Sequence, residues 1–281
     1  VQRMSAPAEV RHEELFRDSG PAEGVVGGFG AVGQAEVERF HAEGYLVVQD
    51  AFDADEIQDA LDGLTYLMDG GDGEFRGVQY EPSMREGIAD MTVEARRAAV
   101  RKVFNFVDHE ARLKATSEHA GLLGALERLI GEPSVLFQDM ALSKPPHVGS
   151  EKPWHQDCAY FDFRHDTPVV AAWIALDEAT YENGCMHVVP GSHRKGPIVH
   201  FQRRDWQICD TDVATTENVV VTLRPGGCLF FHGLCHHGTP PNSTDSPRRA
   251  LQLHYRPAEI VNVTREDRLA VFGDEGKDVT C

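Results

Sequence analysis

The second half of the chain consists of short apolar stretches separated by turn residues, and this pattern restricts the possible folds more than any other feature. The stretches after Pro133 are rich in Val, Leu and aromatic residues and are bounded by Gly, Pro or Asn, which predicts short β-strands. We expect these strands at 134–143, 169–176, 186–189, 219–223, 228–236 and 250–255. Many short strands after a run of helices predict an α+β protein with a sandwich or barrel, and a double-sheet jelly roll has the right size.

The first half of the chain is expected to be mainly helical. Asp53 and Glu56 form a variant of the capping box, and apolar residues follow at helical spacing until Gly70 ends the pattern. The predicted helices span 34–43, 53–69, 93–114 and 120–130.

The remaining segments show weaker patterns. Residues 1–33 are rich in glycine and are expected to be flexible, because ordering such a segment costs much conformational entropy. The segment 72–90 is expected to be a loop that covers the site, and the tail 259–281 to lie on the surface. We therefore predict one domain over 34–281, with a helical part at 34–132 and a strand-rich core at 133–258.

One motif suggests a different fold and is rejected. The stretch 28–33 fits the glycine pattern of dinucleotide-binding proteins, and a predicted strand at 45–49 ends at Asp50, where a ribose-binding acid would be expected. That pattern must follow a buried strand, and only Val25 and Val26 precede it. No alternating series of strands and helices follows in the second half, so nucleotide binding is not predicted.

Composition excludes some classes of partner. The chain has 281 residues, enough for a substantial core, and a net charge of −18, which argues against nucleic acid or an anionic membrane. No stretch of about twenty apolar residues predicts a spanning helix, and the first residues lack the apolar core of a signal peptide. None of the six cysteines forms a Cys-x-x-Cys pair, so we expect reduced thiols in the cytoplasm.

Candidate metal ligands occur at two places in the strand-rich half. His155 and Asp157 are two residues apart, so in an extended strand both side chains point to the same face. The apolar stretch 228–237 supplies a third imidazole, from His236 or His237, and strand alternation does not decide between them. Two histidines and one carboxylate with open positions opposite are typical of non-haem Fe(II) oxygenases. Arg248 follows, with a guanidinium that matches a carboxylate of a co-substrate.

The chain resembles the phytanoyl-CoA dioxygenase family of Fe(II)- and 2-oxoglutarate-dependent oxygenases, from about Phe40 to Pro257. The resemblance rests on motifs in a fixed order, namely Trp154-His155-Gln156-Asp157, Asn183-Gly184, Pro190-Gly191-Ser192-His193, Pro225-Gly226-Gly227, Phe230-Phe231-His232-Gly233, His237-Gly238-Thr239 with Asn242, and Arg248. It implies a double-stranded β-helix, the cupin-like jelly roll, with flanking N-terminal helices.

The resemblance also implies the roles of individual residues. His155, Asp157 and His237 would bind iron. Arg248 and Thr239, the latter in place of the family's usual serine, would bind the far carboxylate of 2-oxoglutarate. Further contacts to this co-substrate would come from Lys102, Met140 and Trp173. From the residues alone, Lys102 is most simply a solvated charge on the predicted helix 93–114.

The implied function is a dioxygenase that uses Fe(II), 2-oxoglutarate and O2. It would hydroxylate a C–H bond of a small-molecule or acyl substrate and release succinate and CO2. Halogenating relatives replace the carboxylate ligand with a small residue, so Asp157 favours hydroxylation.

Three alternatives remain at this point. The first is a zinc site that uses Cys158 or Cys235, which lie beside the candidate ligands. The second is a metal-binding cupin that works without 2-oxoglutarate, and the third is a binding module without catalysis. The basic segment 190–207 is read either as a solvated loop or as a lid that binds a substrate anion, with Trp206 as a wall.

Overall fold

Two β-sheets form the centre of the molecule, and helices cover one of them. The computed structural model describes residues 12–17, 19–213 and 217–273. The larger sheet has eight strands in the order β1-β2-β12-β7-β14-β5-β4-β3, and the smaller has four in the order β11-β8-β13-β6. Within these sheets, all neighbouring strands run antiparallel except β1 and β2. This arrangement confirms the predicted jelly-roll core.

Most of the predicted strands are present with small shifts at their ends. The larger sheet contains β1 Val26–Gly27, β2 Tyr45–Gln49, β3 Val78–Tyr80, β4 Val100–Phe104, β5 Ser134–Lys144, β7 Val170–Ala175, β12 Cys228–His232 and β14 Arg248–Pro257. The smaller sheet contains β6 Lys152–His155, β8 Met186–Val188, β11 Val219–Val221 and β13 His237–Thr239. A separate hairpin is formed by β9 His200–Gln202 and β10 Trp206–Ile208.

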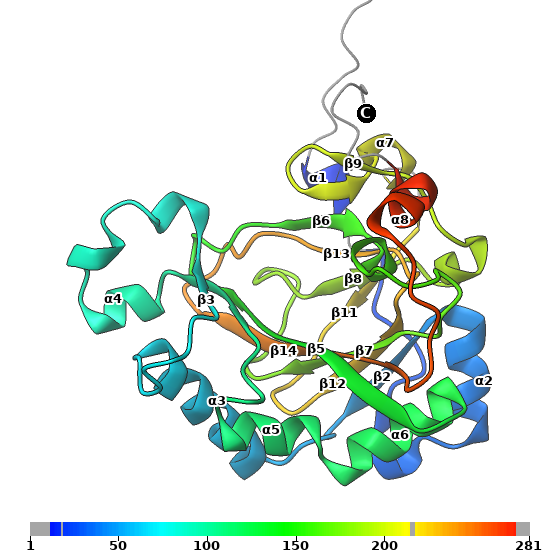
Figure 1. The fold of residues 1–281 in the computed structure, drawn as a ribbon, viewed down its shortest axis with the longest axis horizontal. Helices are drawn as coiled ribbons and strands as arrows, with labels where there is room; N and C mark the ends of the chain where they lie inside the picture. Colours follow the sequence, from blue (N-terminus) through cyan, green and yellow to red (C-terminus); the bar gives the residue numbers. More distant parts are fainter. Residues whose placement is uncertain (1–11, 18, 214–216, 274–281) are drawn as a thin grey trace, which may run out of the picture.

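Two layers of apolar side chains hold these parts together. Alternate residues of the larger sheet face the smaller sheet, where Trp173 and Phe231 are buried. The opposite face, with Phe230 and Leu251, packs against the helices. Figure 1 shows α2, α3, α5 and α6 along that face. The helices are α1 His12–Leu15, α2 Gln34–Glu43, α3 Ala54–Met68, α4 Val93–Arg97, α5 Ala111–Ser117, α6 Ala120–Ile130, α7 Asp210–Val213 and α8 Arg265–Phe272.

The predicted helix 93–114 is wrong. This segment forms α4, then strand β4, then α5. The valines at 100 and 103 fit a helical spacing, but they also suit a strand, and β4 pairs with both β3 and β5. Pairing with the edge of β5 therefore overrides the local helical pattern. The change turns Lys102 from a helix residue into a strand residue of the larger sheet.

The predicted strand 228–236 is also wrong in its extent. It is divided into β12 and β13, which belong to different sheets. A turn at 233–236 separates them, and Gly233 is needed there because a Cβ would lie 2.7 Å from the sulfur of Cys158. The turn carries the chain from the larger sheet to the smaller one, so His237 begins a strand instead of ending one.

The terminal segments are more ordered than predicted. Residues 1–11, 18 and 274–281 lie outside the described residues. Within the rest of 1–33, Leu15 and Phe16 are buried, and the backbone oxygen of Leu15 accepts a hydrogen bond of 2.8 Å from the indole of Trp154. The ring of Phe16 also stacks on Trp154, and such aromatic burial offsets the entropy of ordering. At the other end α8 buries Phe272.

The cysteines follow the prediction only in part. Cys158, Cys185, Cys228 and Cys235 are free and buried, whereas Cys209 is disulfide-bonded. None of the helices in the described part of the chain is long and apolar enough to cross a membrane.

The capping box of α3 allows a test of this fold. The carboxylate of Asp53 accepts hydrogen bonds of 2.9 Å from the backbone N–H groups of Asp55 and Glu56. Asp53→Ala is expected to lower the free energy of unfolding by about 1 kcal/mol, because it removes this cap from a helix on the core. Urea unfolding measures the effect. Asp55→Ala, which leaves the cap in place, is the control, and an equal loss in both variants would contradict the prediction.

Candidate active site

The three candidate ligands come together at the end of the smaller sheet. His155 is the last residue of β6, and Asp157 begins the short 3-10 helix Asp157–Tyr160. His237 begins β13 and lies directly opposite His155 in the antiparallel register. One donor atom from each of the three residues lies within 4.8 Å of the others, and all three side chains are buried. The structure thus places the predicted ligands in one cluster.

His237, and not His236, is part of this cluster. The alternation of side chains along a strand does not distinguish the two histidines. The turn after β12 places His237 at the start of β13 and His236 before it. His236 lies just before the strand, and its backbone N–H bonds the hydroxyl of Ser192. Its side chain is not part of the cavity that His237 lines.

Backbone contacts orient both imidazoles. The Nδ1 atom of His155 lies 2.8 Å from the carbonyl oxygen of Pro153, and that of His237 lies 3.0 Å from the carbonyl oxygen of Cys235. Because a carbonyl only accepts, Nδ1 carries the proton in both rings, and Nε2 keeps its lone pair. The two Nε2 atoms lie 3.3 and 3.6 Å from Oδ1 of Asp157. Three lone-pair donors therefore face one point, which suits a cation.

Electrostatics favours the protonation states that a metal needs. Burial lowers the pKa of His155 to about 3, with His237 and Lys152 adding to the effect, so this imidazole is neutral at pH 7. Burial alone would raise the pKa of Asp157, but the neighbouring His237 and His254 hold it well below its ordinary value. The donor set is thus imidazole nitrogen with an ionised carboxylate, which fits Fe(II).

A cavity of about 200 Å³ opens beside the three ligands. Of the residues predicted to bind a co-substrate, four line it: Lys102, Met140, Thr239 and Arg248. Lys102 enters the cavity because β4 is a strand. Burial lowers the pKa of Lys102 to about 8, with smaller contributions from Lys152 and Arg101.

Arg248 has unused hydrogen-bonding capacity in this cavity. Its side chain is buried, and its Nε and Nη1 atoms have no hydrogen-bond partner among the described residues. Burial lowers its pKa to about 10, so the guanidinium is still a cation at pH 7. Buried donors without partners are rare in native proteins, and a ligand is one reason for them. The buried guanidinium therefore suits a carboxylate ligand that accepts hydrogen bonds from it.

Trp173 lies against Arg248. The indole is fully buried and is not part of the cavity lining. Its ring centroid lies 5.2 Å from the guanidinium carbon of Arg248. Trp173 therefore stabilises the arginine through a cation–π contact, and its contact with a co-substrate stays a prediction.

Sequence reasoning missed several residues of the site. Lys144 is the cross-strand neighbour of Arg248 and is buried in the same cavity. Gln252 and His254 contact Asp157. Their spacing could have indicated this, because residues 248, 252 and 254 share one face of a strand.

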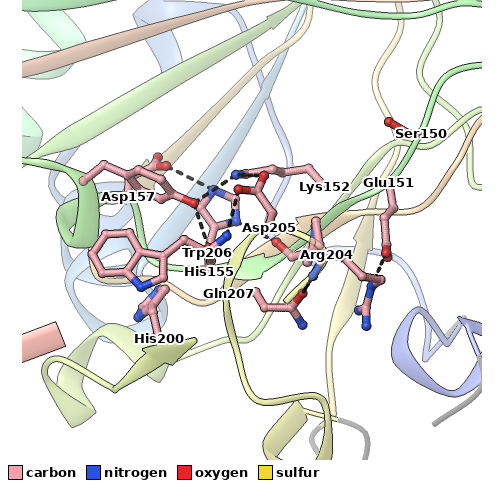
Figure 2. A network of polar contacts seen from close by, with 12 residues as sticks. Ser150, Glu151, Lys152, His155, Asp157, His200, Arg204, Asp205, Trp206 and Gln207 are labelled. Carbon is pink, nitrogen blue, oxygen red and sulfur yellow. Dashed lines mark hydrogen bonds and ion pairs between the residues drawn. The ribbon is translucent and has the colours of Figure 1, made fainter. Parts of the chain in front are cut away.

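A polar network closes the side of the site next to the β9–β10 hairpin (Figure 2). The ammonium of Lys152 lies 2.6 Å from a carboxylate oxygen of Asp205 and 3.0 Å from the hydroxyl of Tyr160. That hydroxyl donates a hydrogen bond of 2.7 Å to the backbone oxygen of Trp206. These contacts fasten the hairpin to β6.

Arg204, one of the cations of the basic segment 190–207, is already paired with carboxylates. Arg204 pairs with both carboxylate oxygens of Asp210, at 2.5 and 2.9 Å, and also with Glu151. None of the side chains of 190–207 lines the cavity. The segment supports the wall of the site from outside, and this geometry does not favour its interpretation as a substrate lid.

The geometry also gives no support to a zinc–thiolate site. Cys158 and Cys235 are not members of the ligand cluster. Burial raises the pKa of Cys235 to about 12 and raises that of Cys158 above its ordinary value. Both are therefore thiols at pH 7, whereas zinc binds thiolates.

Comparison with known proteins identifies the family. The family model described as Phytanoyl-CoA dioxygenase (PhyH) matches residues 40–250. The chain belongs to this family. Membership places it among the Fe(II)- and 2-oxoglutarate-dependent dioxygenases, and it confirms the resemblance that the sequence motifs indicated.

Individual relatives differ in how much they share with the chain. It is 29% identical over 263 residues to "Probable phytanoyl-CoA dioxygenase" of Caenorhabditis elegans, covering 86% of this chain and 82% of the relative. It is 35% identical over 128 residues to "Methylphosphonate hydroxylase" of Gimesia maris, covering 45% and 47%. The chain spans about half the length of several further relatives.

A solved structure supports the fold. The epimerase SnoN, in complex with Fe3+, alpha ketoglutarate and nogalamycin RO, superimposes with a TM-score of 0.67 at 23% identity, covering 84% of this chain and 87% of that one. At this identity the likeness shows the jelly-roll fold alone.

Replacing Arg248 tests whether the buried guanidinium lacks a partner that stabilises its charge. Arg248→Met is expected to raise the free energy of unfolding of the protein without co-substrate, on the order of 1 kcal/mol, because an apolar side chain of similar length replaces a buried cation. Urea unfolding without 2-oxoglutarate measures this.

The matched control is the next residue in the strand. Arg249 bonds both carboxylate oxygens of Asp177 at 2.8 Å, so Arg249→Met is expected to destabilise the protein. A comparable loss of stability in the Arg248 variant would contradict the inference that its charge is unmatched.

Proposed function

We propose that this dioxygenase is a non-haem hydroxylase that oxidises an unactivated C–H bond of a small-molecule or acyl substrate. In this reaction O2 and 2-oxoglutarate are consumed, one oxygen atom enters the substrate, and succinate and CO2 are released. The observation that carries the proposal is one cavity that contains a cluster of two imidazoles and one carboxylate beside an unpaired buried arginine.

The ligand cluster fits iron. We propose that His155, Asp157 and His237 hold the ion through Nε2, Oδ1 and Nε2, the atoms that converge in the structure. When bound, iron supplies the oxygen-activating redox chemistry that is coupled to the decarboxylation of 2-oxoglutarate. The protein holds both imidazoles in the tautomer that leaves Nε2 free.

The cavity is also suited to a dianionic co-substrate. We propose that Arg248 binds the far carboxylate of 2-oxoglutarate, that the hydroxyl of Thr239 donates to the same group, and that Lys102 adds a second positive charge. Although the whole chain carries −18, cations outnumber acids in the cavity lining. The cations are Arg101, Lys102, Lys144, Lys152 and Arg248, and the acids are Glu81 and Asp157. Such a local field attracts a dianion despite the overall charge.

The size and lining of the cavity limit the substrate. A volume of about 200 Å³ leaves room for 2-oxoglutarate and either a small molecule or the end of a longer acyl chain. Met140, Leu142 and Phe161 supply apolar surface near the ligands. The names of the relatives refer to phytanoyl-CoA and to methylphosphonate, so we propose the reaction class without adopting either substrate.

We also propose a reducing compartment such as the cytoplasm, supported by four buried free thiols. The disulfide at Cys209 is the one observation against it in the described part of the chain.

Variants of the neighbouring residues His236 and His237 test the proposed iron site. Anaerobic addition of Fe(II) and then 2-oxoglutarate to the wild-type protein should produce a weak visible charge-transfer band only when both are present. His237→Ala is expected to abolish this band and succinate release, because it removes a ligand. His236→Ala, at the neighbouring position, should retain both.

Other results would favour other functions. Metal binding without a 2-oxoglutarate band would favour a cupin that works without the keto acid. Full turnover in the His237 variant would overturn the ligand assignment.

The pH dependence of co-substrate binding tests Lys102. Its ammonium is charged below its pKa of about 8 and becomes neutral as the pH rises through that value. Affinity for the dianion is therefore expected to be highest below pH 8 and to fall above it, by about tenfold or more when a charge-assisted contact is lost. Titration of the charge-transfer band with 2-oxoglutarate on both sides of this pKa measures the change.

Two variants separate the charge of Lys102 from its bulk. Lys102→Arg stays charged over this range and should keep its affinity above pH 8. Lys102→Met should bind weakly at every pH and lose the dependence. A wild-type affinity that is constant across this range would remove Lys102 from the proposed role.

A further inference from the structure

Strand β14 brings two more side chains to the metal-binding carboxylate. Gln252 and His254 lie on the same face of the strand as Arg248, and both are buried. The amide nitrogen of Gln252 lies 3.2 Å from Oδ2 of Asp157, and Nε2 of His254 lies 2.8 Å from the same oxygen. The larger sheet therefore reaches across the core to a ligand that belongs to the smaller sheet.

The two oxygens of Asp157 have different surroundings. Oδ1 faces the Nε2 atoms of His155 and His237, at 3.3 and 3.6 Å. Oδ2 faces Gln252 and His254. One oxygen is thus directed to the point on which the imidazoles converge, while the other is held by the strand opposite.

Both contacts to Oδ2 are donated by the strand. An ionised carboxylate only accepts hydrogen bonds, so Nε2 of His254 carries its proton, as the amide nitrogen of Gln252 does. The ring of His254 is fixed by neighbouring aromatic rings, with centroids 5.2 Å from Phe161 and 5.9 Å from Phe137. His254 is fully buried, so its donor cannot turn to solvent.

We infer that Gln252 and His254 are positioning residues for the iron site, which hold Oδ2 so that Asp157 binds the metal through Oδ1 alone. The inference rests on the proposed function. If Oδ2 were free to turn, the carboxylate would bind through both oxygens and occupy a position that the keto acid or O2 requires. Hydrogen bonds to a ligating carboxylate also fix its direction, and their loss typically weakens metal affinity by about 10–100-fold.

Cobalt(II) is a suitable probe, because its visible spectrum reports the number and arrangement of ligands without any turnover. Anaerobic titration of the full chain with Co(II) gives both affinity and spectrum. His254→Leu and Gln252→Leu are each expected to weaken Co(II) binding by about tenfold or more and to change the spectrum, because Oδ2 is released. His254→Gln keeps an N–H donor and should recover most of the affinity and the wild-type spectrum.

His187 provides a matched control. It is a completely buried histidine of β8 that faces Asn218, with Nδ1 of the ring 2.9 Å from the amide oxygen, and it does not line the cavity. His187→Leu is expected to lower the melting temperature as His254→Leu does, but to leave the spectrum of bound Co(II) unchanged. This control separates a general loss of packing from a change at the metal ligand.

The outcomes distinguish this inference from the proposed function. A wild-type protein that binds neither Fe(II) nor Co(II) would overturn the proposed function itself. Wild-type binding with an unchanged spectrum and affinity in both leucine variants would leave the function intact and overturn the positioning role. A shifted spectrum in His254→Leu that is restored in His254→Gln is the expected result. If His254→Leu does not fold, the Co(II) titration of Gln252→Leu decides whether the contacts to Oδ2 position Asp157.

Discussion

The structure depends on the burial of one carboxylate between two sheets. Asp157 lies in the core, where an isolated negative charge would be strongly destabilised. Three imidazoles and one amide surround it, two from the ligand cluster and two from β14. The two groups of β14 donate to Oδ2, and no lysine or arginine among the described residues forms a salt bridge with Asp157. Oδ1, which faces the two imidazole lone pairs, is therefore left available to a metal ion.

Strand β14 carries both Arg248 and the two side chains that contact Asp157. It pairs with β5 on one side and β7 on the other, so it is held in the middle of the larger sheet. Arg248 begins the strand and lines the cavity, while Gln252 and His254 contact Asp157. Because all three lie on one strand, the spacing between Arg248 and the two side chains that contact Asp157 is set by backbone geometry and not by a flexible loop.

Much of the site could be predicted from the sequence, because its parts are local patterns. The pair His155 and Asp157, the glycine after His237 and the arginine at the head of a strand are each visible in a few residues. The choice between His236 and His237 needed either the family resemblance or the structure, since it depends on where the chain leaves one sheet for the other. The place of Lys102 in a strand also needed the structure, because pairing with β5 overrides the helical pattern of its segment. The spacing of His254 from Arg248 places both on one face of a strand, but its contact with Asp157, 97 residues earlier, needed the structure.

The buried basic side chains of the cavity lower the stability of the fold, but they also suit the binding of an anion. Arg248 and Lys144 are neighbouring buried basic residues, and burial lowers the pKa of each. Neither has a carboxylate partner among the described residues, so both are less stable in this cavity than they would be in water. A dianion that enters the cavity would offset much of this repulsion. An acidic protein can thus hold an acidic co-substrate, because the charge next to the cavity is positive and solvent and salt screen the more distant exposed charges that contribute to the net −18.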